Sequence, residues 1–144
     1  MIDKFEVASL EHIGKVLGET EYGFTGTEIE RILTECGIQD PGPFTKWQRI
    51  YEALRQNQDE SRCANHVVRF LEEAMKPVRY LYKKELFEQR RNDLNIILSL
   101  EGFVIDKSGK TKRTEQTFSL DDATQRANSL KRKLKDRNTH PEVY

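Results

Sequence analysis

Residues 83–113 read KKELFEQRRNDLNIILSLEGFVIDKSGKTKR. The apolar side chains before Gly102 recur at helical spacing, and glycine is a typical residue just after the end of a helix. Val104 and Ile105, a turn that contains Gly109, and Thr111–Thr114 then predict a two-stranded hairpin over residues 103–114. A helix followed directly by a basic hairpin allows a winged-helix-like arrangement, although ordinary packing produces the same order of elements.

The polar face of this helix and the hairpin carry side chains suited to nucleic acid. Arginine and asparagine on the helix can reach base edges or phosphates, and lysines on the hairpin can contact the backbone. Glu85, Glu88 and Asp93 dilute the positive charge, and Arg-rich helix faces are often only solvated. The predicted nucleic-acid-binding residues are Lys84, Arg90, Arg91, Asn95, Lys107, Lys110, Lys112 and Arg113.

Charge is distributed unevenly along the chain although its formal net charge is zero. Residues 1–35 hold three basic and eight acidic side chains, whereas residues 107–137 hold ten basic and four acidic ones. The basic end favours an anionic partner, and the asymmetry equally allows one end of the molecule to complement the other end of a second copy. Overall neutrality weakens the first interpretation.

Composition predicts one globular domain with a small core, since 36% of the 144 residues are apolar and 33% are charged. We expect this domain to span residues 1–138. Residues 139–144 are interpreted as a tail and as the beginning of a linker to an effector domain beyond the chain. The apolar runs fall short of the roughly 18–20 residues that cross a membrane, and the first residues lack a signal-peptide core. A cytoplasmic protein is therefore expected.

Outside residues 83–113, cap residues and apolar repeats predict five further helices. The clearest start is the capping box of Thr25 and Glu28. The third helix carries an apolar stripe centred on Trp47, and we expect it to end in the polar run 56–60, with Ser61 capping the next helix. The other starts and stops are assigned to Ser9, Gly18, Gly37, Pro77 and Ser119. The sequence thus predicts a mainly α, α+β fold of about six helices and one hairpin.

Catalytic chemistry finds little support in the sequence. His12, His66 and His140 lie far apart, and the glycines form no phosphate-binding loop, so we expect no metal and no cofactor. Cys36 and Cys63 are typical of buried, reduced thiols. Cys63 and His66 would share a helical face, which is compatible with thiol activation, but a surface histidine beside a small buried cysteine is the commoner arrangement. No catalytic residue is assigned.

Seven short segments spread over nearly the whole chain carry a family resemblance: Leu17–Thr20, Phe24–Ile29, Thr45–Arg49, Ala74–Tyr80, Phe87–Glu88, Leu94–Asn95 and His140–Val143. Together they resemble the N-terminal region of Ymh-type abortive-infection proteins. In that family such a region precedes a C-terminal HEPN-like helical domain, which is the suspected effector in defence against phage. The resemblance implies that any RNA-cleaving residues belong to that second domain and not to this chain.

These observations together predict a non-enzymatic sensing or regulatory module of a bacterial antiphage protein. The expected partner is DNA or RNA, bound through the basic helix and hairpin. The alternative is a protein-interaction or oligomerisation module, which contacts another copy of itself or controls a HEPN-like RNase effector domain. No membrane association is expected.

Overall fold

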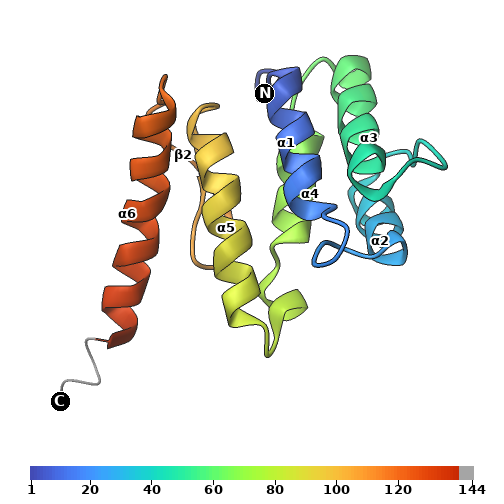
Figure 1. Cartoon of the computed structure of the whole chain (residues 1–144). Coiled ribbons are helices and arrows are strands. Elements are labelled where there is room, and N and C mark those ends of the chain that lie inside the picture. The colour runs from blue at the N-terminus through green and yellow to red at the C-terminus, as the bar shows by residue number, and fades with distance from the viewer. Residues whose placement is uncertain (140–144) are drawn as a thin grey trace. The chain divides into compact units, whose positions relative to one another are not determined.

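The computed structural model describes the backbone of residues 1–139 and the side chains of residues 1–131. Within this part of the chain it contains six α-helices, one short 3-10 helix (η1) and one two-stranded hairpin (Figure 1). The predicted mainly α, α+β class is confirmed. Of the predicted tail, only Thr139 is described, as the last residue of a helix; the rest of it and the segment His140–Val143 lie outside the described residues.

The chain divides into two compact units, Met1–Lys76 and Pro77–Tyr144, which we call unit 1 and unit 2. The expected single domain over residues 1–138 stays a prediction, because units of this size can belong to one domain. Within the described residues, none of the helices is both long enough and apolar enough to cross a membrane.

Unit 1 is built from four helices, α1 (Val7–Leu17), α2 (Gly26–Cys36), α3 (Lys46–Ser61) and α4 (Asn65–Ala74). Helix α1 packs against α3, and α2 packs against α4. The predicted capping box is confirmed, since Thr25 accepts from the Glu28 amide and Glu28 accepts from the Thr25 amide. The predicted stop is confirmed as well: Gly37 adopts the left-handed conformation, with a φ of 69°.

Three predicted helix boundaries in unit 1 are wrong. Helix α1 begins after Glu6, so Ser9 lies inside the helix and is buried. Helix α3 continues through the polar run to Ser61, and Ala64 precedes α4. The predicted end of α3 is wrong because Gln58 is buried within the polar run. Its side chain is only 1% exposed and pairs with the backbone of Phe5.

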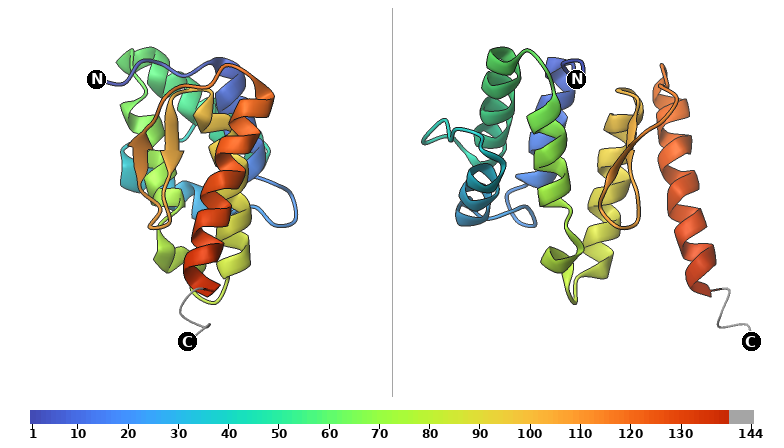
Figure 2. Two further views of the ribbon diagram at one scale, coloured as in Figure 1. Left: turned by 90° about the vertical axis from the view of Figure 1, so that its left-hand side faces the viewer. Right: turned by 180° about the vertical axis from the view of Figure 1, so that it is seen from behind.

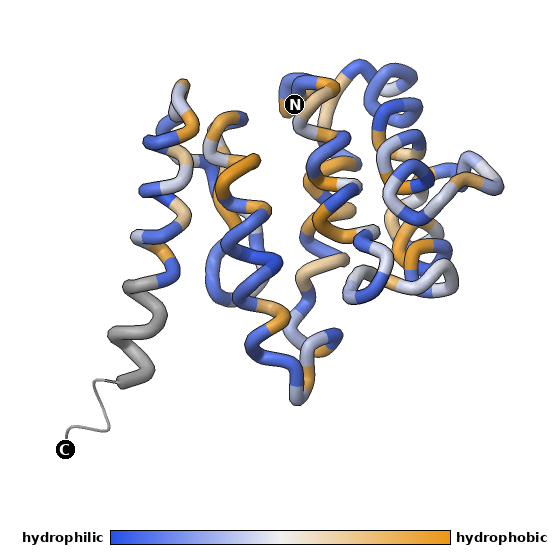
Figure 3. The backbone as a smooth tube through the Cα atoms, in the orientation of Figure 1, coloured by the Kyte–Doolittle hydropathy of each residue, from blue (hydrophilic) through white to orange (hydrophobic). Residues whose placement is uncertain are grey.

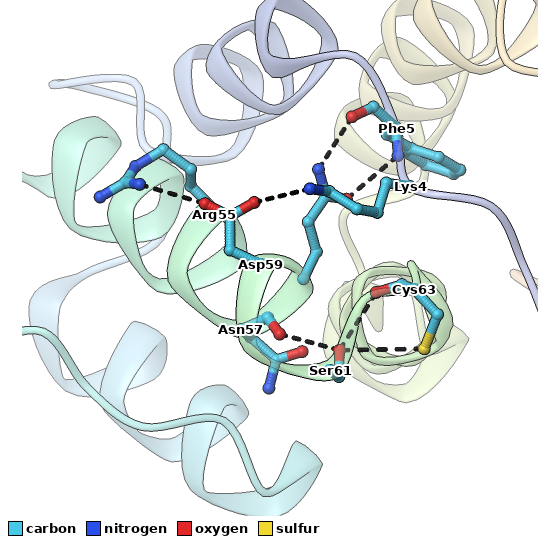
Figure 4. Close-up of polar contacts among 8 residues, drawn as sticks. Lys4, Phe5, Arg55, Asn57, Asp59, Ser61 and Cys63 are labelled. Carbon is cyan, nitrogen blue, oxygen red and sulfur yellow. Dashed lines mark hydrogen bonds and ion pairs between the residues drawn. The ribbon is translucent and has the colours of Figure 1, made fainter.

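The N-terminal segment is held against the end of α3 by both charged and neutral contacts (Figure 4). Gln58 Oε1 accepts from the Phe5 amide at 3.1 Å, and Gln58 Nε2 donates to the Phe5 carbonyl at 2.8 Å. Lys4 Nζ lies 3.0 Å from Asp59 Oδ1. Gln58, in the middle of the polar run, therefore belongs to a packed interface, which periodicity alone cannot distinguish from a solvated helix end.

The contact between α1 and α3 depends on a glycine. A Cβ added to Gly14 would lie 2.7 Å from the backbone oxygen of Trp47. Gly14→Ala is therefore expected to destabilise unit 1 by about 1–2 kcal/mol, because forced separation of the helices outweighs alanine's higher helix propensity. Urea unfolding followed by circular dichroism measures this difference.

Gly26→Ala is the matched control for that substitution, because a Cβ there would meet only Arg49 Nη1, at 3.5 Å. We expect this variant to be as stable as the wild type or slightly more stable. Equal stability of the Gly14→Ala and Gly26→Ala variants would contradict the proposed close approach of α1 and α3.

Unit 2 contains η1 (Pro77–Tyr80), α5 (Lys84–Ser99), β1 (Phe103–Ile105), β2 (Thr111–Arg113) and α6 (Leu120–Thr139). Helix α5 contacts both β1 and α6 (Figure 2). The strands are antiparallel, and their register pairs Phe103 with Arg113, Val104 with Lys112, and Ile105 with Thr111. The predicted hairpin is thus confirmed. The predicted start of the last helix is confirmed too, since the Ser119 hydroxyl accepts from the Asp122 amide at 3.1 Å.

Candidate nucleic-acid interface

The part of α5 that carries Arg91 and Asn95 is covered by β1, the first strand of the hairpin. Asn95 is 1% exposed, and its side-chain amide bonds to both backbone groups of Ile105, as the backbone of a neighbouring strand would. The Ile105 amide donates to Asn95 Oδ1 at 2.7 Å, and Asn95 Nδ2 donates to the Ile105 carbonyl at 3.1 Å. That carbonyl also accepts from Arg91 Nε at 3.0 Å. These bonds fix the position of β1 on α5.

The two adjacent arginines of α5 hold different segments of unit 2. Arg90 Nη1 donates to the Tyr80 hydroxyl at 2.9 Å, and its guanidinium lies 5.5 Å from the centre of the Tyr80 ring. Arg91, besides binding Ile105, lies 3.4 Å from Glu88 Oε2. Arg90 thus secures η1, and Arg91 secures β1.

The expected exposure of Arg90, Arg91 and Asn95 is wrong, because all three are buried. The hairpin folds back onto the helix face that carries Arg91 and Asn95, and Arg90 bonds to Tyr80 of η1, so all three side chains bond to protein groups. Burial this deep leaves them no open surface for base edges, and we omit them from the candidate interface. Lys84, in contrast, is exposed at the start of α5.

The hairpin holds the other predicted cations, and all four are exposed: Lys107, Lys110, Lys112 and Arg113. Figure 3 shows the turn between the strands as a continuous hydrophilic segment. Lys112 is 67% exposed and lies 3.4 Å from Asp106 Oδ2, while the Arg113 guanidinium lies 5.0 Å from the centre of the Phe103 ring. Lys107 and Lys110 form no ion pair with any side chain that the structure describes.

The hairpin turn is organised by Asp106. Its Oδ1 accepts from the Ser108 amide at 2.9 Å, the Ser108 hydroxyl at 2.7 Å and the Lys110 amide at 3.0 Å. Burial by itself would raise the pKa of Asp106, but the bonds from Ser108, Lys110 and Lys112 together hold this pKa below its ordinary value. The ionised carboxylate thus fixes the loop that presents Lys107 and Lys110.

Asp106→Asn is expected to destabilise unit 2 by about 1–2 kcal/mol at neutral pH, because a neutral amide accepts these bonds less strongly. A lowered folded-state pKa means that the stabilisation is present above the unfolded pKa and is lost as the pH falls through the folded one. The difference in stability from the wild type should therefore shrink below about pH 4. Thermal unfolding between pH 7 and pH 2 measures it.

Asp3→Asn, which removes an exposed carboxylate of unit 1, controls for the change in net charge. A stability difference for Asp106→Asn that stays constant down to pH 2 would show that the carboxylate does not organise the turn.

The alternative pair, Cys63 and His66, does not share a helical face. Helix α4 begins only at Asn65, so Cys63 lies in the preceding connection. Its thiol is buried, as expected, and lies 3.8 Å from the Ser61 hydroxyl (Figure 4). In the described part of the chain no hydrogen bond joins Cys63 to His66. This geometry gives no support to an activated thiol.

An exposed segment before α5 was not singled out from the sequence. Val78, Leu81 and Tyr82 are 73%, 62% and 97% exposed, and the exposed Lys83 and Lys84 follow them. The sequence does hold a signal for this segment, because large apolar side chains cluster in a connection between helices, where polar residues are usual.

Comparison with known proteins adds no identification, since no family model, curated protein or solved structure matches this chain. The resemblance to Ymh-type abortive-infection proteins therefore stays a prediction, and so does the winged-helix-like arrangement. Binding chemistry can be assigned only from the geometry of the chain itself.

Proposed function

We propose that unit 2 binds the phosphate backbone of nucleic acid through the hairpin. The observation that carries this proposal is a fixed turn presenting exposed cations, of which Lys107 and Lys110 have no ion-pair partner among the described side chains. Lysine is a compact, flexible positive charge suited to phosphate groups. Asp106 is the single acidic residue of the hairpin, and its carboxylate is occupied by the turn.

The proposed contact is with the backbone and not with base edges. Arg90, Arg91 and Asn95 are the side chains with the best chemistry for reading bases, and they are bonded inside unit 2. Lysines alone give affinity that varies little with sequence and falls steeply with salt. The protein is thus proposed to detect the presence of nucleic acid and not a particular sequence.

In its biological context we propose a non-enzymatic regulatory module of an abortive-infection protein. The resemblance of the chain to the leader region of that family supports this assignment. Nucleic-acid binding by the leader would then control a HEPN-like effector domain, which supplies the RNA cleavage. A Cys63-dependent activity is not proposed, because the thiol is buried and not aligned with His66.

Fluorescence anisotropy of labelled DNA and RNA at low salt tests this proposal. The triple variant Lys107→Ala, Lys110→Ala, Lys112→Ala should bind about tenfold or more weakly, and to the same extent for different sequences, because each lysine lost removes one phosphate contact. The matched control is Lys4→Ala, Lys15→Ala, Lys76→Ala, which removes three exposed charges from unit 1, each paired with a carboxylate in the wild type. This control should bind like the wild type.

Equal affinities of the two triple variants would contradict the proposed interface. A wild-type chain that binds neither DNA nor RNA at low salt would contradict the function itself. The protein-interaction alternative would then be favoured, supported by the exposed side chains of Phe118 and Leu120, which are 84% and 72% accessible.

A further inference from the structure

The segment that joins η1 to α5 exposes an aromatic ring beside two lysines. Tyr82 is 97% exposed and Leu81 is 62% exposed, and Lys83 and Lys84 follow directly. These lysines make no ion pair with any side chain that the structure describes, although the exposed Glu85 is next in sequence. A fully exposed tyrosine buries almost no surface, so packing does not account for it.

The backbone of Tyr82 gives a second indication. Its φ is 68°, in the left-handed region that bulky residues rarely adopt. Glycine or asparagine would suit this conformation better, so folding stability alone does not favour tyrosine here. Unfavourable backbone conformations of this kind are concentrated at binding and catalytic sites.

The residues just before Tyr82 are firmly anchored. Tyr80 is 5% exposed, packs edge-on against Phe87 with ring centres 5.2 Å apart, and accepts the bond from Arg90. Since Arg91 holds Ile105 at the end of β1, neighbouring residues of α5 hold the residues that directly precede the two exposed segments: Tyr80 before 81–84, and Ile105 before the hairpin turn. Figures 1 and 2 show the hairpin turn beside the N-terminal half of α5, toward the end where residues 81–84 lie.

We propose that Tyr82 stacks on an unpaired base of a single-stranded nucleic acid, with Lys83 and Lys84 on the adjoining phosphates. An exposed ring next to cations is the chemistry that binds single strands, because every base offers a flat face for stacking. In a duplex these faces are already stacked, so the ring gains nothing there. This inference rests on the proposed function and specifies its ligand class as single-stranded DNA or RNA.

Anisotropy with the full chain, using labelled oligothymidine, oligouridine and a duplex of mixed sequence, tests the inference. Tyr82→Ala should weaken single-strand binding about tenfold, because one base loses its stacking partner, and should leave duplex binding unchanged. Tyr82→Phe should retain the wild-type affinity, since the ring persists. Comparison of the oligothymidine and oligouridine arms shows which of these two single strands is preferred.

Phe118→Ala and Tyr22→Ala are the matched controls, because they remove aromatic rings that are 84% and 72% exposed elsewhere in the chain. Both should bind single strands like the wild type. Wild-type single-strand affinity in Tyr82→Ala, while the hairpin variant still loses binding, would overturn the stacking inference and leave the proposed function standing. Absence of binding to all three probes in the wild type would overturn both.

Discussion

Replacing Asn95 with alanine is expected to lower the free energy of unfolding of unit 2 by about 2–4 kcal/mol. Asn95 is 1% exposed and satisfies both the amide and the carbonyl of Ile105. Alanine would leave the buried Ile105 amide without its partner, and the carbonyl would keep only Arg91. Because these bonds attach β1 to α5, the hairpin should loosen before the rest of the unit unfolds.

Chemical denaturation followed by circular dichroism measures the total loss of unfolding free energy. Amide hydrogen exchange at Ile105 reports the local loosening of the hairpin. Asn128→Ala is the matched control, since Asn128 is exposed on α6 and its replacement should change stability by less than about 0.5 kcal/mol. If Asn95→Ala unfolds at the same denaturant concentration as Asn128→Ala, the side-chain bridge does not hold the hairpin.

Replacing Gln58 with alanine should have an effect of similar size, about 2–4 kcal/mol, on unit 1. Gln58 is 1% exposed and makes the same pair of bonds to the backbone of Phe5 that Asn95 makes to Ile105. Phe5 is itself only 4% exposed, so water replaces the lost bonds only if the N-terminal segment moves away. We expect detachment of this segment together with a loss of stability.

Urea unfolding measures the loss in Gln58→Ala, and proteolysis near Phe5 detects release of the segment. Gln56→Ala, two residues earlier on α3, is the matched control because Gln56 is exposed. Resistance to proteolysis equal to that of the control would count against the role given to Gln58.

The elements that could be predicted from sequence are those fixed by neighbouring residues. The Thr25–Glu28 capping box, the left-handed Gly37 and the hairpin over residues 103–114 depend on side chains within a few positions of one another. Such contacts form wherever the local sequence allows them, so a single sequence is sufficient to find them.

The boundaries and exposures that could not be predicted depend on partners distant along the chain. Gln58 bonds to a residue 53 positions away and Asn95 to one 10 positions away, and in both cases a polar side chain is buried because it pairs with backbone. A prediction from periodicity places polar residues at the surface. It therefore ended α3 too early and treated Arg90 and Asn95 as exposed. Only the folded arrangement reveals these backbone partners.

The candidate site shows the same division between local and distant information. Exposure of the hairpin lysines follows from their place in a short basic turn, and the structure bears it out. Tyr82 was missed because its 97% exposure and positive φ are properties of the backbone path between η1 and α5. No local pattern in the sequence predicts that conformation for a tyrosine.

The salt dependence of nucleic-acid affinity tests the central claim most directly, namely that hairpin lysines contact phosphates. A plot of log affinity against log salt should be less steep for the Lys107, Lys110 and Lys112 triple alanine variant than for the wild type. The slope of this plot should be smaller in magnitude by about two on single strands and by nearly three on duplex, because the variant releases fewer counterions. Identical slopes for the two proteins would contradict the claim.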